Sequence, residues 1–198
     1  RMGMKAENHE GYVGTADYVG DNDEKKIAII GHLDTVPCGP GWSQDPHKMT
    51  RREGYLIGRG TLDDKGPFVV SAYAAKYWHD AGYQFPYTLR LILGCNEETG
   101  FQDVYYYNEH FEQPAFILSP DAEFPVSAGE KGIYEGIFTS GPITDGKIVS
   151  WNAGEAPNAI PSDAHVIVKA DLAALPARDG ITFSDEGDGC VRITAKGK

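Results

Sequence analysis

The stretch Lys25-Lys-Ile-Ala-Ile-Ile-Gly-His-Leu-Asp34 places an apolar, β-branched run directly before two polar side chains. Such a run suits a buried strand, and with residues 11–19 and the turn-forming residues 20–24 it predicts a β-hairpin. His32 and Asp34 then follow the carboxyl end of the strand. In an extended backbone, side chains two positions apart point to the same side of the chain.

The same alternation of elements continues along the chain. Residues 87–94 and 115–118 are further apolar runs of strand type. Helical spacing of apolar residues predicts helices over about residues 65–81 and 102–110. Strands that alternate with helices indicate an α/β domain with a mostly parallel, twisted sheet flanked by helices.

The chemically capable side chains cluster by position. Several acidic residues and one histidine fall just beyond the carboxyl ends of predicted strands, where ligands bind in open α/β sheets. These residues are His32, Asp34, Glu97, Glu98 and Asp121.

The pattern changes after about residue 131, where several further segments are of strand type. The predicted strands cover residues 132–139, 165–169 and 191–194. We therefore expect two parts, a catalytic α/β domain over residues 1–132 and the beginning of a smaller α+β domain over residues 133–198.

Composition and charge exclude several classes of function. Eighteen basic and 29 acidic residues give a net charge of −11, which disfavours nucleic acid as a partner. No apolar run approaches the roughly 20 residues of a membrane span. The three cysteines have no metal-type spacing, and their odd number argues against a disulfide framework, so we expect a cytoplasmic protein.

His32 and Asp34 can form part of a metal site. Histidine and carboxylates are ligands for Zn²⁺, and carboxylates also suit Mn²⁺. His32 can bind the metal while Asp34 accepts its other ring N–H, which fixes the tautomer. Alternatively, both side chains serve loop hydrogen bonds.

Asp63 and Asp64 lie at a predicted helix start, between Gly60 and Gly66. A carboxylate here can bridge two metal ions, because glycines allow the backbone to approach closely. Two metals roughly 3.5–4 Å apart would form a clamp for hydrolysis. The alternative is a helix N-cap, a position that aspartate favours.

Glu97 and Glu98 follow a buried strand, where adjacent like charges repel unless a cation or a shared proton relieves them. One can bind metal while the other takes a proton from a metal-bound water. Asp121, after Ser119-Pro120, is another candidate ligand. The alternatives are solvated loop glutamates and a surface turn.

Taken together and in order, these motifs resemble the di-zinc exopeptidases that include aminoacylase, carnosinase and PepV-type bacterial dipeptidases. The motifs are His32-x-Asp34, Gly58-Arg-Gly-x-x-Asp63-x-Lys-Gly66 and Glu97-Glu98. The phrases Asn96-Glu-Glu-Thr-Gly100 and Ser119-Pro-Asp-Ala-Glu123 are similar to the PepV-type dipeptidases in particular.

The resemblance implies a role for each residue. His32 and Asp121 would bind one zinc, Glu98 the other, and Asp63 would bridge the two. Glu97 would act as the general base, and Asp34 would orient His32. A non-proline cis peptide between Asp63 and Asp64 is also implied.

The resemblance further implies a small lid domain, to which residues 133–198 would belong. Asn158 would contact the bound peptide there, although a turn residue is an equally good interpretation. A late histidine that completes the second zinc site, and a lid histidine, have no counterpart in the chain. We therefore expect the chain to be part of a longer enzyme.

The expected function is hydrolysis of dipeptides by a cytoplasmic metallodipeptidase that uses two zinc ions, or manganese. The alternatives are an N-acyl amino acid deacylase of the same family and a non-catalytic fragment with an incomplete metal site. The substrate's side chains and the oligomeric state are left open.

Overall fold

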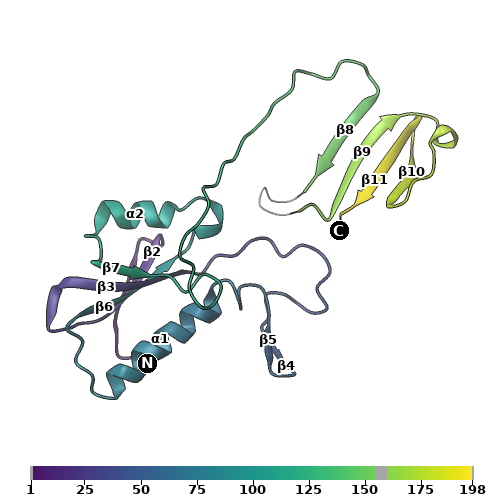
Figure 1. Cartoon of the computed structure of the whole chain (residues 1–198). Helices are drawn as coiled ribbons and strands as arrows, with labels where there is room; N and C mark the ends of the chain where they lie inside the picture. The colour runs from purple at the N-terminus through teal and green to yellow at the C-terminus, as the bar shows by residue number, and fades with distance from the viewer. Residues whose placement is uncertain (1, 155–159, 198) are drawn as a thin grey trace. The chain divides into compact units, whose positions relative to one another are not determined.

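The computed structural model describes residues 2–154 and 160–197 (Figure 1). Its contacts divide the chain into two compact units. The first consists of residues 1–36 and 43–130, and the second of residues 37–42 and 131–198. The assignment of residues 1–132 and 133–198 to a catalytic and a lid domain stays a prediction.

A five-stranded sheet in the order β1-β2-β6-β3-β7 forms the centre of the first unit. Its strands are β1 (Lys5–His9), β2 (Val13–Tyr18), β3 (Asn22–His32), β6 (Tyr87–Gly94) and β7 (Phe116–Leu118). β3 pairs in parallel with β6 and with β7, whereas β2 pairs antiparallel with β1 and β6. The sheet is therefore mixed, with a parallel half that contains the metal-ligand candidates.

The predicted hairpin between residues 11–19 and 25–31 is wrong. β6 lies between β2 and β3 in the sheet, so these two sequential strands do not pair. β3 gains a parallel partner on each side over residues 27–29, within its apolar part, as expected where both faces of a sheet are covered.

Two helices cover opposite faces of this sheet. Leu91 and Ile92 are neighbours in β6, so their side chains point to opposite faces. Leu91 packs with Phe68 and Ala72 of α1 (Lys65–Asp80). Ile92 packs in a second cluster with Tyr107, which belongs to α2 (Gln102–His110). The α/β class predicted for this part of the chain is confirmed.

Shorter elements complete the first unit. β4 (Thr50–Arg52) and β5 (Tyr55–Ile57) pair as a two-stranded antiparallel sheet before the Gly-rich segment that leads to α1. A 3-10 turn, η1 (Glu97–Thr99), follows β6 and holds both glutamates. Figure 1 shows α1 and α2 on the two sides of the strands.

The second unit is built around a four-stranded antiparallel sheet in the order β10-β11-β9-β8. Its elements are β8 (Ile148–Ala153), β9 (Asp163–Lys169), the 3-10 turn η2 (Leu172–Ala174), β10 (Ile181–Gly187) and β11 (Cys190–Lys196). Asp188 and Gly189 adopt positive φ angles of 51° and 68° in the tight turn between β10 and β11. Val191 of β11 is only 2% exposed.

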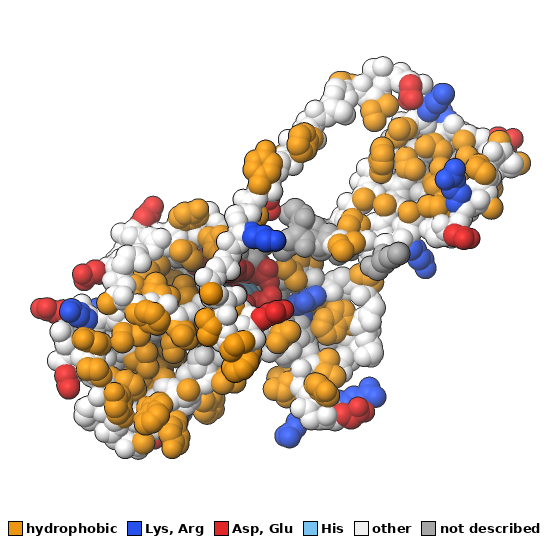
Figure 2. Space-filling model, viewed as in Figure 1, with side chains coloured by type: hydrophobic (Ala, Val, Ile, Leu, Met, Phe, Trp, Pro, Cys, Tyr) orange, Lys and Arg blue, Asp and Glu red, His pale blue; other side chains and the backbone are white. Residues whose placement is uncertain are grey.

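The strand predicted over residues 132–139 is wrong. No ladder among the described residues includes this segment, and Ile133 and Phe138 are 91% and 92% exposed. A strand needs a hydrogen-bonding neighbour, and an apolar pattern alone does not supply one. Figure 2 shows hydrophobic side chains along the extended segment that leads to β8. None of the described helices is long and apolar enough to cross a membrane.

Candidate metal centre

His32 is the last residue of β3 and is only 2% exposed. Its Nδ1 lies 3.1 Å from the backbone oxygen of Asp34 and 3.4 Å from the Asp34 carboxylate. Its Nε2 lies 2.9 Å from Oδ1 of Asp63 and 3.4 Å from Oδ2 of Asp121. The ring is thus held on one side and faces two carboxylates with the other.

Asp34 also holds the loop that carries the paired glutamates. Its Oδ1 accepts the backbone N–H of Glu97 at 3.2 Å, and its Oδ2 accepts that of Glu98 at 3.0 Å. One carboxylate therefore connects the ends of β3 and β6, which are parallel neighbours in the sheet. This is the placement that the carboxyl ends of parallel strands produce.

Asp64 stands at the N-cap position of α1, but its side chain makes no capping hydrogen bond. It is fully buried, and its Oδ2 accepts the backbone N–H of His32 at 3.3 Å. Its Oδ1 has no hydrogen-bond partner among the described residues. A Cβ atom at Gly31 would lie 2.3 Å from Asp64 Oδ2, so glycine permits this close approach. The peptide between Asp63 and Asp64 is cis.

The negatively charged carboxylates of the site repel one another. Burial, with a contribution from Asp121, raises the pKa of Asp64 to about 6. Burial also raises the pKa of Asp121, to which the charge of Asp63 adds, and the pKa of Glu97. Burial disfavours protonation of His32, but the charge of Asp121 and the hydrogen bond to Asp63 outweigh it and raise the pKa of His32. A cation would relieve this repulsion.

The described residues contain two groups whose possible ligand atoms all lie within 4.8 Å of one another. One group is His32, Asp64 and Asp121, and the other is His32, Glu97 and Glu98. A histidine surrounded by carboxylates, with one buried carboxylate oxygen lacking a partner, fits a Zn²⁺ or Mn²⁺ ion.

The structure brings together six of the seven residues that the sequence singled out. His32, Asp34, Asp63, Glu97, Glu98 and Asp121 are all linked through His32 or Asp34. Asn158 lies outside the described residues. Sequence reasoning did not select Asp64 as a site residue, although it lies in the same motif as Asp63. Asp64 is fully buried, whereas the side chain of Asp63 is 60% exposed.

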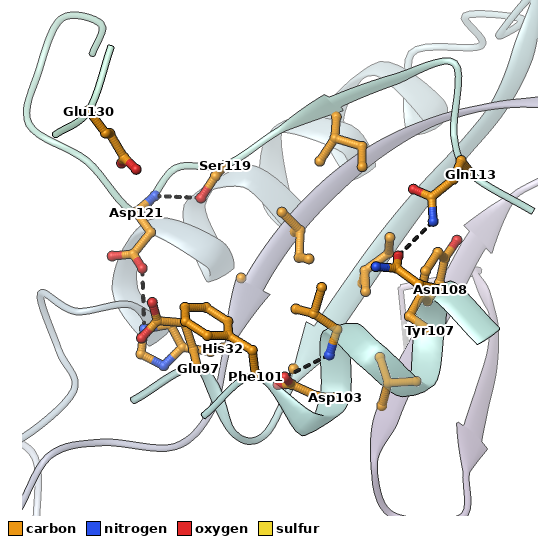
Figure 3. A pocket seen from close by; sticks show the side chains of 17 residues that line it. His32, Glu97, Phe101, Asp103, Tyr107, Asn108, Gln113, Ser119, Asp121 and Glu130 are labelled. Carbon is orange, nitrogen blue, oxygen red and sulfur yellow. Dashed lines mark hydrogen bonds and ion pairs between the residues drawn. The ribbon is translucent and has the colours of Figure 1, made fainter. Parts of the chain in front are cut away.

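A cavity of about 310 Å³ opens beside these residues (Figure 3). His32, Glu97 and Asp121 line one end of it, and Figure 3 shows their side chains directed toward one another. Its interior is lined by Ile92 of β6 and Tyr107 of α2, among other apolar side chains. The polar centre thus adjoins an apolar hollow between the sheet and α2.

A model of a known protein family matches most of this chain. Residues 28–188 match the model of Peptidase family M20/M25/M40. The chain belongs to this family. The match includes every candidate metal ligand and confirms the resemblance to the metal-dependent exopeptidases. Members of a metallopeptidase family depend on bound metal, in agreement with the donor set around His32.

Two curated members of the M20/M25/M40 family are similar to the chain over most of its length. A Beta-Ala-Xaa dipeptidase of Lactobacillus delbrueckii subsp. lactis is 37% identical, in an alignment that covers 98% of the chain and 42% of the relative. The putative dipeptidase YtjP of Bacillus subtilis (strain 168) is 31% identical, with 85% and 37% covered. The chain therefore spans about two fifths of the length of these relatives.

A solved structure shares the fold of part of the chain. Human carnosine dipeptidase 1 superposes with a TM-score of 0.52 and 25% identity, covering 62% of this chain and 30% of that structure. The fold neighbour and the sequence relatives thus point to the same family.

Proposed function

We propose that the protein containing this chain is a metallodipeptidase that hydrolyses dipeptides with a two-zinc centre and a glutamate base. The observation that carries the proposal is His32 Nε2, which faces the carboxylates of Asp63 and Asp121 at the carboxyl end of β3. The proposal also rests on two relatives that are named as dipeptidases.

In this proposal His32 and Asp121 would hold one zinc, Glu98 would hold the other, and Asp63 would serve both. Manganese is the alternative metal, since carboxylates suit it as well. When bound, such ions polarise the scissile carbonyl and lower the pKa of the attacking water. Asp34 holds the His32 ring through Nδ1, so that Nε2 keeps its direction.

Glu97 is the proposed general base. It takes a proton from the attacking water and later passes it to the leaving amine. Burial raises the pKa of Glu97, with opposition from His32 and support from Asp121, so the carboxylate is a better proton acceptor than an exposed glutamate. Its backbone is fixed by Asp34, which limits its movement relative to His32.

A substrate panel tests the proposed reaction in the full-length protein. Dipeptides with an amino-terminal β-alanine, dipeptides of α-amino acids, and N-acetyl amino acids would be assayed with Zn²⁺ and with Mn²⁺. We expect hydrolysis of dipeptides. Preferential cleavage of N-acetyl amino acids would instead support a deacylase, and no hydrolysis of either class by metal-loaded protein would support a non-catalytic role.

Two further parts of the proposal concern the wider protein. We propose a cytoplasmic location, supported by three cysteines that form no disulfide. Fractionation of cells that express the native gene would test it, with recovery outside the cytoplasm as the contrary result. The lid assignment of residues 133–198 and the substrate contact of Asn158 remain predictions.

A further inference from the structure

Asp103 is a buried carboxylate with no part in the proposed reaction. It lies in the first turn of α2 and is 2% exposed, whereas acidic residues in a first helical turn are ordinarily exposed to solvent. Its Oδ2 accepts the backbone N–H of Cys95 at 2.6 Å and that of Asn96 at 2.8 Å. Its Oδ1 accepts the N–H of Val104 at 2.8 Å.

Asp103 and Asp34 together hold four successive backbone amides. Asp103 accepts the N–H groups of Cys95 and Asn96, and Asp34 accepts those of Glu97 and Glu98. The two carboxylates come from different segments, one after β3 and the other in α2. The backbone that leaves β6 is therefore fixed at each residue up to the paired glutamates.

Gly94 shows how closely this carboxylate fits the backbone. A Cβ atom at Gly94 would lie 2.4 Å from Oδ2 of Asp103, which is far inside van der Waals contact. Only a residue without a side chain permits Asp103 to reach the amides that follow. The last residue of β6 and the first turn of α2 thus form one packed unit.

We propose that Asp103 is a positioning residue for the Glu97–Glu98 pair, acting through the backbone of Cys95 and Asn96. Hydrogen bonds to an ionised acceptor are roughly twice as strong as neutral ones, and a buried amide that loses its acceptor is costly. Without Asp103 the loop would keep its hydrogen bonds to Asp34 but lose its attachment to α2. The inference rests on the proposed function, because it assigns Glu97 and Glu98 to catalysis and metal binding.

The test is Asp103→Asn in the full-length enzyme, compared with Asp17→Asn. Asp17 pairs through both carboxylate oxygens with Arg90, at 2.8 and 2.7 Å, and is likewise poorly exposed. It lies far along β2 from the end of β6 that leads to Glu97, since its register partner is Arg90. Both variants remove a poorly exposed charge, but only Asp103→Asn removes a charge that holds the amides of this loop.

We expect Asp103→Asn to lower kcat by about 10- to 100-fold per folded, metal-loaded molecule, with KM unchanged. Asp17→Asn should lower the melting temperature yet retain kcat. Gly94→Ala keeps Asp103 in the sequence, but its Cβ would displace the carboxylate from the amides, so this variant should reproduce the kcat loss. Wild-type kcat in folded Asp103→Asn would overturn the proposal.

Amide exchange gives a readout that does not depend on activity. In metal-free protein, Asp103→Asn should accelerate exchange at residues 95–98 while the amides of β3 keep their protection. Unchanged exchange at residues 95–98 would overturn the positioning role even if the enzyme is active. If the wild-type protein hydrolyses no dipeptide but the exchange increases, the proposed function fails and the positioning role stands.

Discussion

His32 Nε2 lies 2.9 Å from Oδ1 of Asp63, although the two residues are 31 positions apart in the sequence. The contact joins the end of β3 to the segment before α1, and Asp121 approaches the same nitrogen from the end of β7 at 3.4 Å. Three segments thus bring one imidazole and two carboxylates to one point. A cation bound between these atoms would offset the repulsion between the two carboxylates.

Replacement of His32 should weaken metal binding. His32→Gln removes the imidazole donor that faces Asp63 and Asp121, so we expect at least about a tenfold loss of zinc affinity. Competition with a chelator of known affinity measures the change. His79→Gln is the matched control, since His79 lies in the last turn of α1. Equal zinc affinity of both variants and the wild type would contradict the assignment of His32.

Metal-free protein should lose stability as the pH rises from about 4 to about 7. The pKa of Asp64 is raised from 3.8 to about 6 by burial and by Asp121, so the folded state holds this proton more tightly than the unfolded state. The stabilisation is complete below about pH 4 and is lost as the pH passes about 6. Its size is at most about 3 kcal/mol.

Urea unfolding of chelator-treated protein across this range measures the effect. Asp64→Asn carries no titratable group and should flatten this part of the pH profile. A wild-type profile that rises with pH between about 4 and 7, or one that Asp64→Asn leaves unchanged, would contradict the role given to Asp64.

Ile92 should contribute strongly to the free energy of unfolding, because it is a core residue. It is 1% exposed and packs with Val13, Ala28 and Tyr107 between the sheet and α2. Ile92→Ala should lower the free energy of unfolding by about 2–5 kcal/mol. Val70→Ala, at a position that is 69% exposed on α1, should change it by less than about 0.5 kcal/mol. Similar losses for both variants in urea unfolding would contradict this packing.

Local patterns predicted the individual elements well. The helix expected over residues 65–81 is α1 (Lys65–Asp80), and the strand expected over residues 87–94 is β6. Both depend on periodicity within a short window and on a clear end signal. The hairpin failed because strand pairing is a long-range property. β6 lies more than 50 residues after β3 begins, yet it separates β3 from β2.

For the site, too, residues within short motifs were predicted, whereas a residue whose role depends on the fold was not. The order of motifs led to His32, Asp63 and Glu97, because each motif is short and chemically distinctive. Asp103 was missed because acidic residues are common in first helical turns, and only the fold shows that this one is buried against Gly94. A glycine that ends a strand just before paired acids was the one signal available in the sequence.

The central claim is that Glu97 is a base in a metal-dependent hydrolase, and Glu97→Gln in the full-length protein tests it most directly. Metal content and dipeptide hydrolysis would be measured on the same preparation, beside Glu123→Gln as an acidic control outside the cluster. We predict that Glu97→Gln retains the wild-type metal content and loses turnover by at least about 100-fold. Retained turnover at full metal content would contradict the account.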